Sequence, residues 1–177
     1  MIIAKQMLTI VTLGIVLALA GCQVQESPKP QSSHNFNTPI ENLITGGQPS
    51  LTNLSELKDA GVTKVINLRG PNEEVSFNEQ AEAEALGLEY ISLPISGAAD
   101  VTSENARKLN ELLEGNGKVF LHCASGNRVG ALLAIRAHEI EGKSVDASLQ
   151  FGRAAGLGSL EKRVKSVLIE KHSTAVP

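Results

Sequence analysis

One stretch of the sequence brings together residue types that can carry out nucleophilic chemistry on an anion. An apolar run ends in His122 and Cys123, four small or polar residues follow, and Arg128 stands at the start of a helical pattern. A loop that joins a strand to a helix directs successive backbone N–H groups inward, and the helix dipole adds positive potential. The same field favours the thiolate, so we expect Cys123 to be nucleophilic near neutral pH; the alternative is a buried structural thiol.

Arg128 completes the expected anion site. A guanidinium binds two oxygens of a tetrahedral oxyanion at once, which a lysine ammonium does not, and Gly126 permits a backbone conformation that other residues resist. We expect anion binding from the residues after the cysteine: Ala124, Ser125, Gly126, Asn127 and Arg128. His122 is expected to orient this loop by hydrogen bonding, and an ordinary strand-end histidine is the alternative.

Two further residues are candidates for supporting roles. Asp100 lies 23 residues before Cys123, on a loop after a predicted strand, and is the best candidate for a general acid that protonates the leaving group. A solvated acid before a helix is the alternative. Arg69 stands at the carboxyl end of a predicted strand, where α/β sheets bind ligands, and a structural ion pair fits its position equally well.

The remaining ionisable residues predict neither a metal site nor a cofactor. The acidic residues between the second and third predicted strands are most simply a solvated helix face: Glu73, Glu74, Glu79, Glu82 and Glu84. The other histidines share no ligand spacing with cysteines or carboxylates.

Strand-like and helical patterns alternate along the chain. Short apolar runs predict strands at residues 43–45, 63–68, 88–93 and 118–122. Helical periodicity predicts helices at residues 52–60, 77–86, 129–140, 145–155 and 160–171, and another that Ser103 caps and that ends near Leu113. This order predicts an α/β fold with a central, mostly parallel sheet and helices on both faces.

Composition limits the function further. The chain has 177 residues, 42% hydrophobic and 20% charged, which suits one globular domain. A net charge of -3, no Trp and one Tyr argue against a nucleic-acid partner. Two cysteines cannot build a disulfide framework.

The amino-terminal segment is expected to direct the protein to the bacterial cell envelope. Residues 1–21 have one early cation and an apolar run too short to span a membrane, and they end in Leu19-Ala20-Gly21 before Cys22. This resembles the lipoprotein box, in which the cysteine is lipidated; an uncleaved anchor is the alternative. Residues 22–40 are polar and predict a flexible tether, so the domain is expected at residues 41–177.

The whole pattern resembles a bacterial branch of the cysteine-dependent phosphatases, the dual-specificity-like phosphatases related to the beta-lactamase hydrolase-like family. The resemblance covers residues 44–168 and rests on five motifs: Gly46 to Ser50, Gly61 to Arg69, Gly87 to Pro94, Ser96-Gly97, and Cys123 to Arg128. It implies a three-layer phosphatase fold and hydrolysis of a phosphorylated protein or small molecule through a cysteinyl-phosphate.

Three departures from the wider phosphatase pattern predict a slow enzyme or a different substrate. The loop is one residue shorter than the phosphatase signature, Val129 stands where many members have Ser or Thr, and Ala124 stands where the branch often has Arg. A short loop also fits a rhodanese-like sulfurtransferase that uses a Cys123 persulfide, although the paired upstream motifs of that family are missing. A catalytically weak anion-binding domain is the third possibility.

Overall fold

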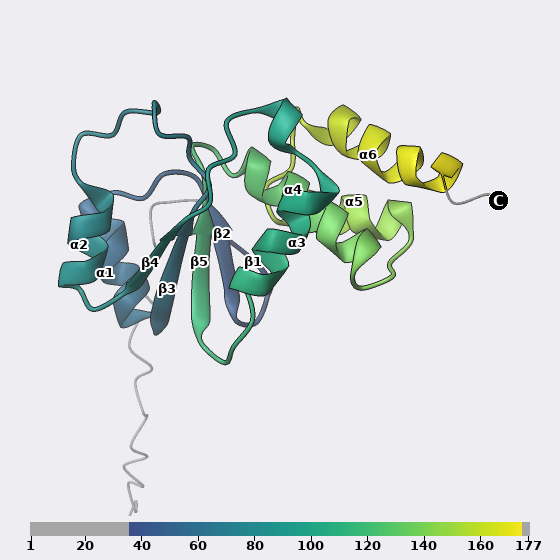
Figure 1. Ribbon diagram of the computed structural model, residues 1–177. Helices are drawn as coiled ribbons and strands as arrows, with labels where there is room; N and C mark the ends of the chain where they lie inside the picture. The colour runs from purple at the N-terminus through teal and green to yellow at the C-terminus, as the bar shows by residue number, and fades with distance from the viewer. Residues whose placement is uncertain (1–35, 175–177) are drawn as a thin grey trace, which may run out of the picture. The chain divides into compact units, whose positions relative to one another are not determined.

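A five-stranded sheet runs through the centre of the computed structural model, which describes residues 36–174, with side chains to residue 170 (Figure 1). In spatial order the strands are β1 (Asn37–Ile40), β2 (Leu43–Gly46), β5 (Lys118–His122), β3 (Val62–Asn67) and β4 (Glu89–Ser92). Only β1 runs antiparallel to its neighbour. The predicted signal peptide and Cys22 lie outside the described residues.

The register of the parallel strands brings their carboxyl ends to one edge of the sheet. His122, the last residue of β5, pairs with Gly46 of β2 on one side and with Asn67 of β3 on the other. Cys123 therefore begins its loop at the middle of this edge. The carboxyl edge of a parallel sheet is where α/β proteins bind ligands, so the strand order itself places the loop at a binding position.

Helices cover both faces of the sheet (Figure 1). The helices are α1 (Leu51–Asp59) and α2 (Glu79–Ala85) on one face, and α3 (Ser103–Leu112), α4 (Asn127–Glu139), α5 (Val145–Ala154) and α6 (Glu161–Thr174) on the other. Neighbouring residues on a strand face opposite ways, so Val65 packs with α1 and α2 whereas Ile66 packs with the second group. The predicted three-layer α/β fold is confirmed. None of the described helices is long and apolar enough to cross a membrane.

The expectation that the tether extends to residue 40 is wrong, because residues 37–40 form β1. This short edge strand pairs with β2 across a turn at Glu41 and Asn42, and the Phe36 ring before it lies 4.9 Å from that of Phe120. None of its four side chains is fully buried, so its sequence lacks the apolar alternation that marks a strand.

Two helix starts also differ from the predicted ones. Thr102, not Ser103, caps α3, since its side chain accepts the N–H of Asn105 at 3.2 Å. Helix α4 begins at Asn127 rather than at Val129, which places Arg128 in its first turn. The other predicted elements agree with the structure to within a few residues.

Candidate active site

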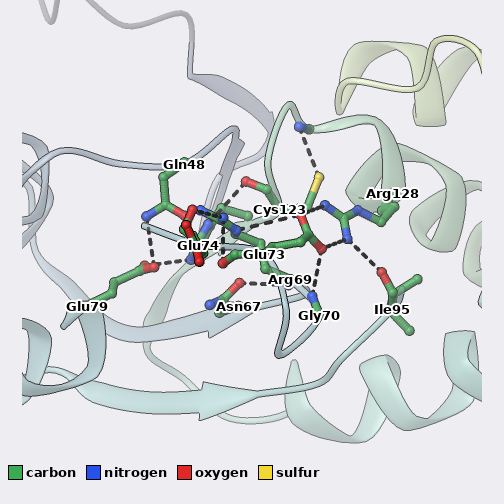
Figure 2. A network of polar contacts seen from close by, with 12 residues as sticks. Gln48, Asn67, Arg69, Gly70, Glu73, Glu74, Glu79, Ile95, Cys123 and Arg128 are labelled. Atoms are coloured by element: carbon green, nitrogen blue, oxygen red, sulfur yellow. Dashed lines mark hydrogen bonds and ion pairs between the residues drawn. The ribbon is translucent and has the colours of Figure 1, made fainter. Parts of the chain in front are cut away.

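Cys123 lies at the end of the central strand with its thiol shielded from solvent (Figure 2). The backbone N–H of Gly126 donates to its sulfur at 3.1 Å. Gly126 has a φ of 86°, a left-handed conformation that glycine adopts without strain. The turn at this glycine therefore directs an amide at the nucleophile, where it stabilises negative charge on sulfur.

The pair Gly46-Gly47 lets β2 pass close against the cysteine loop. Gly47 bridges to Ser125, and the N–H of Gln48 donates to the carbonyl of Ala124 at 3.2 Å. A Cβ atom at Gly47 would lie 2.8 Å from that carbonyl oxygen, which is too close for any side chain. This contact explains Gly47 in structural terms, whereas a Cβ atom at Gly46 would meet the Phe36 ring.

Backbone amides in and after the loop are available to an anion. Within the described part of the chain, no acceptor is recorded for the N–H groups of Ala124, Ser125, Asn127 and Arg128. Two of them belong to the first turn of α4, whose N–H groups have no partner within the helix and whose dipole attracts negative charge. The predicted anion loop thus has the donors that the prediction requires.

The Asn127 side chain has a different role. Its Oδ1 accepts the N–H of Gly158 at 2.8 Å, and its Nδ2 donates to the Ser159 hydroxyl at 2.7 Å. It fixes the connection between α5 and α6, so any contribution of Asn127 to anion binding comes from its backbone.

Arg128 commits one edge of its guanidinium to the protein. Nη1 and Nη2 donate to the two carboxylate oxygens of Glu73, the latter at 2.7 Å, and Nη1 also donates to the Ile95 carbonyl at 2.7 Å. Three of the five N–H groups are engaged. The remaining two N–H groups, on Nε and Nη2, form the second edge of the guanidinium, which can bind two oxygens of an anion. The pKa of Arg128 is raised by its hydrogen bond to Glu73 and, to a smaller extent, by the nearby Cys123.

Glu73 is the partner that orients Arg128, and the sequence analysis wrongly assigned it to a solvated helix face. It lies on the loop before α2, where its carboxylate also accepts the N–H of Gly70 at 2.7 Å. The hydrogen bond from Arg128 is the main cause that lowers the pKa of Glu73 to about 2. The carboxylate is therefore ionised throughout the neutral range.

Arg69 supports the loop that carries Glu73 instead of facing Cys123. Its Nη2 donates to the carbonyls of Glu73 and Glu74, both at 2.8 Å, and its Nη1 donates to the Gln48 side chain. It also forms an ion pair with Glu73, 3.7 Å between Nε and Oε2. Of the two roles considered for Arg69, the structural one fits these contacts.

His122 forms a buried pair with Glu79, a second acid that the sequence analysis wrongly assigned to the solvated face. Nε2 of His122 lies 2.7 Å from Oε1 of Glu79, and both side chains are almost fully buried. Nδ1 of the same ring lies 3.4 Å from the Cys123 carbonyl oxygen. Gln48 Nε2 donates to the other Glu79 oxygen at 2.8 Å. His122 thus contacts the first residue of the loop, and its role in orienting the loop stays a prediction.

Asp100 lies on the loop that passes Arg128, but its carboxylate has another partner. It accepts the backbone N–H of Ser96 at 2.8 Å, at the end of a short helical turn, Ala98–Asp100. The structure records no contact between Asp100 and Cys123 or Arg128, so its role as general acid stays a prediction. Across the described residues, no cluster of His, Cys, Asp and Glu could hold a metal ion.

Comparisons with known proteins agree with this geometry. A family model described as "DSP-PTPase phosphatase fused to NAD+ Kinase" matches residues 22–167. A beta-lactamase hydrolase-like protein from Agrobacterium fabrum is 27% identical over 147 residues, which cover 77% of this chain and 32% of that protein. The chain therefore spans about a third of the length of this curated relative.

Solved structures show the same fold. A candidate phosphatase from Neisseria meningitidis superposes with a TM-score of 0.63 at 21% identity, covering 74% of this chain and 96% of that one. TpbA from P. aeruginosa, solved in complex with pTyr, gives a TM-score of 0.54 at 19% identity, covering 74% and 79%. At these identities the likeness establishes the fold.

Proposed function

Because the chain belongs to the family of DSP-PTPase phosphatases fused to NAD+ kinase, we propose that it is a cysteine-dependent phosphatase that hydrolyses phosphate monoesters. One observation carries this proposal: the buried Cys123 thiol shares its loop with backbone amides that have no recorded acceptor and with an Arg128 whose second edge is left for a ligand. The loop amides and this edge of Arg128 suit the oxygens of a phosphoryl group.

The reaction proceeds in two displacement steps. The Cys123 thiolate attacks phosphorus in line, the S–P bond forms, and the P–O bond to the leaving group breaks. An acid, for which Asp100 is the candidate, gives its proton to the departing oxygen. Water then attacks the cysteinyl-phosphate, releasing inorganic phosphate and the thiolate, while the Gly126 N–H stabilises the charge returned to sulfur.

The second step is expected to limit turnover. Val129 offers no hydroxyl to assist the departing thiolate. The donors that face the sulfur are the Gly126 amide, at 3.1 Å, and the Arg128 guanidinium. One fewer loop residue also means one fewer amide around the phosphoryl oxygens. These features support an enzyme that is slower than members with the longer loop.

The proposed substrate is a phosphorylated protein or small molecule. The structure of TpbA in complex with pTyr shows that a protein of this fold binds a phosphorylated side chain. Few aromatic residues are present to recognise a phenyl ring, only 3% of the chain, so the phosphoryl group itself is the recognised part.

A direct assay tests the activity. The full chain, purified in detergent, should release p-nitrophenol from p-nitrophenyl phosphate, and Cys123→Ser should reduce the rate to background. Activity that persists in Cys123→Ser would refute the cysteinyl-phosphate mechanism. Lys143→Ala is a suitable control because Lys143 lies after α4, away from the loop.

The short loop is the one observation that favours the sulfurtransferase alternative. Incubation with thiosulfate and cyanide separates the two activities, since a sulfurtransferase forms thiocyanate through a persulfide. A Cys123 adduct heavier by one sulfur atom, together with an absence of phosphatase turnover, would reverse the assignment.

We also propose that the protein is anchored by lipid on Cys22 at the extracytoplasmic face of a bacterial membrane. The support is the Leu19-Ala20-Gly21-Cys22 sequence after an apolar run. Cells fed an alkyne-bearing fatty acid should label the protein, and Cys22→Ala should abolish the label whereas Cys123→Ser retains it. Equal labelling of the Cys22→Ala variant would contradict the proposal.

A further inference from the structure

A continuous series of polar contacts connects the residue before the nucleophile to the arginine that ends the loop. In order it passes through His122, Glu79, Gln48, Arg69, Glu73 and Arg128. Figure 2 shows its members from Glu79 to Arg128. We propose that Glu79 is a positioning residue of this series: it holds the His122 ring, and through that ring it holds the first peptide unit of the anion loop. This inference rests on the proposed phosphatase function.

The Glu79 carboxylate is buried and has a polar atom close to each of its oxygens. The residue is 4% exposed, Oε1 lies 2.7 Å from His122 Nε2, and Oε2 accepts from Gln48 Nε2 at 2.8 Å. Burying a carboxylate costs free energy unless partners compensate, and an apolar residue would fill this space at lower cost. The first turn of α2 contributes, because its dipole favours an acid there.

The Glu79 carboxylate faces Nε2 of the His122 ring at 2.7 Å, so it fixes which edge of the ring is turned toward the Cys123 carbonyl. The ring cannot turn away, because it stacks on Phe120 with centroids 5.2 Å apart and planes 6° apart. Nδ1 is thereby held 3.4 Å from the Cys123 carbonyl oxygen.

The Cys123 carbonyl matters because of its own peptide unit. In a planar trans peptide the carbonyl and the N–H point in opposite directions. The peptide of the Cys123 carbonyl carries the N–H of Ala124, one of the amides available to an anion. A His122 ring that binds the carbonyl therefore keeps the Ala124 N–H directed away from the ring. Glu79 acts on the phosphoryl site by this route without touching the ligand.

The charged and titratable groups around the pair come from neighbouring elements. Arg69, at the end of β3, reaches Glu79 through Gln48. Tyr90, on β4, lies near enough that burial and then the Glu79 charge raise its pKa. Cys123 follows His122 directly. The test must therefore separate the charge at Glu79 from the hydrogen bonds that it accepts.

Exchanging the side chains at positions 48 and 79 separates the charge at Glu79 from the hydrogen bonds that it accepts. In Glu79→Gln alone, the side chain has one acceptor oxygen instead of two, so its NH2 group must face either His122 Nε2 or Gln48 Nε2, and one contact of the series is weakened. In the double variant Glu79→Gln/Gln48→Glu the new carboxylate at position 48 accepts from the amide at 79 and from Arg69. The hydrogen bonds are restored, the net charge is unchanged, and the charge has moved away from His122.

Three readouts on the full-length protein distinguish a positioning role from a purely structural one. They are the thermal unfolding midpoint, the pH dependence of Cys123 alkylation by iodoacetamide with and without phosphate, and kcat and KM for p-nitrophenyl phosphate. We expect the double variant to recover the unfolding midpoint but to keep a shifted alkylation profile, weaker phosphate protection and a kcat/KM roughly tenfold below wild type. Glu79→Asp, which keeps the charge near the ring, should partly restore the profile, and Glu82→Gln on the exposed side of α2 should change nothing.

Two results would overturn the proposal. One is a double variant that recovers alkylation and phosphate protection along with stability, since the role would then be structural. The other is a folded Glu79→Gln whose alkylation profile matches wild type. The alkylation assay needs no turnover, so a wild-type protein that binds phosphate without hydrolysing esters would refute the proposed function while still testing this inference.

Discussion

The guanidinium of Arg128 divides its donors between the protein and a ligand. Glu73 takes the Nη1–Nη2 edge, and the Ile95 carbonyl takes a further N–H. This arrangement fixes the plane of the group before any anion arrives, so binding need not immobilise a flexible side chain. Glu73 is therefore expected to strengthen phosphate binding although both carry negative charge.

The substitution Glu73→Gln tests whether Glu73 strengthens phosphate binding. The amide presents one acceptor and one donor to two N–H groups, so Arg128 loses one hydrogen bond from a charged donor. That loss is worth about 1.5 kcal/mol, and we expect a roughly tenfold weaker phosphate affinity. Isothermal titration of the variant in a Cys123→Ser background measures it, with Glu74→Gln as the control. Tighter binding would mean that Glu73 competes with the ligand for Arg128.

The single tyrosine reports on Glu79 directly. Tyr90 is the only Tyr in the chain and there is no Trp, so tyrosinate absorbance comes from one residue. Burial is the main cause of its raised pKa, the hydrogen bond from Asn67 opposes it, and the Glu79 charge adds to it. Glu79→Gln should therefore lower the pKa of Tyr90, whereas Glu82→Gln should not. A titration curve unchanged by Glu79→Gln would place the carboxylate charge elsewhere.

For individual residues, the sequence predicts the nucleophile Cys123 and Arg128 but not the acids that contact His122 and Arg128. Cys123 and Arg128 share one short segment, and local loop geometry determines their roles. Glu73 acts on Arg128 across 55 residues of sequence, and Glu79 acts on His122 across 43, from a stretch that holds several similar acids. Only tertiary contact distinguishes them from exposed neighbours such as Glu82.

Among the helices, α4 and α5 approach closely because both carry a glycine at their contact. A Cβ atom at Gly130 would lie 2.1 Å from the Leu157 nitrogen, and one at Gly152 would lie 2.7 Å from the Gly130 carbonyl oxygen. Both obstacles are backbone atoms, which cannot move aside by a change of rotamer. The first turn of α4 carries Arg128, so this contact also sets the position of the site.

Gly130→Ala should destabilise the protein by about 1–3 kcal/mol, because an extra methyl group in a packed contact forces the backbone apart. Urea unfolding measures the change. Gly158→Ala is the matched control, since its Cβ would meet only the Asn127 side chain at 3.8 Å. Equal stability of the two variants would show that α5 shifts freely against α4.

The elements themselves are largely predictable, whereas their pairing is not. Buried strands such as β3 and β5 are short apolar runs with β-branched residues, which the sequence displays directly. Strand β1 escapes prediction because an edge strand needs few apolar residues. The order β1-β2-β5-β3-β4 depends on long-range contacts, which local periodicity does not encode.

For the molecule as a whole, the Glu73–Arg128 pair makes stability depend on pH. The pKa of Glu73 falls from an ordinary 4.5 to about 2 on folding, so the folded state binds its proton less tightly than the unfolded state. Its stabilising contribution is complete above about pH 4.5 and is lost as the pH falls toward 2. The stability difference between wild type and Glu73→Gln should shrink between pH 6 and pH 3 in urea unfolding. A difference that stays constant over this interval would contradict the lowered pKa.

The strand order has a consequence for the synthesis of the protein. β5 is the last of the described strands along the sequence, yet it lies between β2 and β3, which have no other common neighbour in the sheet. A nascent chain that has not yet released residues 118–122 from the ribosome can hold a hairpin and a separate βαβ unit, but not one sheet. The strand that joins them also ends at the nucleophile. Translation therefore completes the sheet and the reactive loop together, and shorter chains expose unpaired strand edges that invite aggregation.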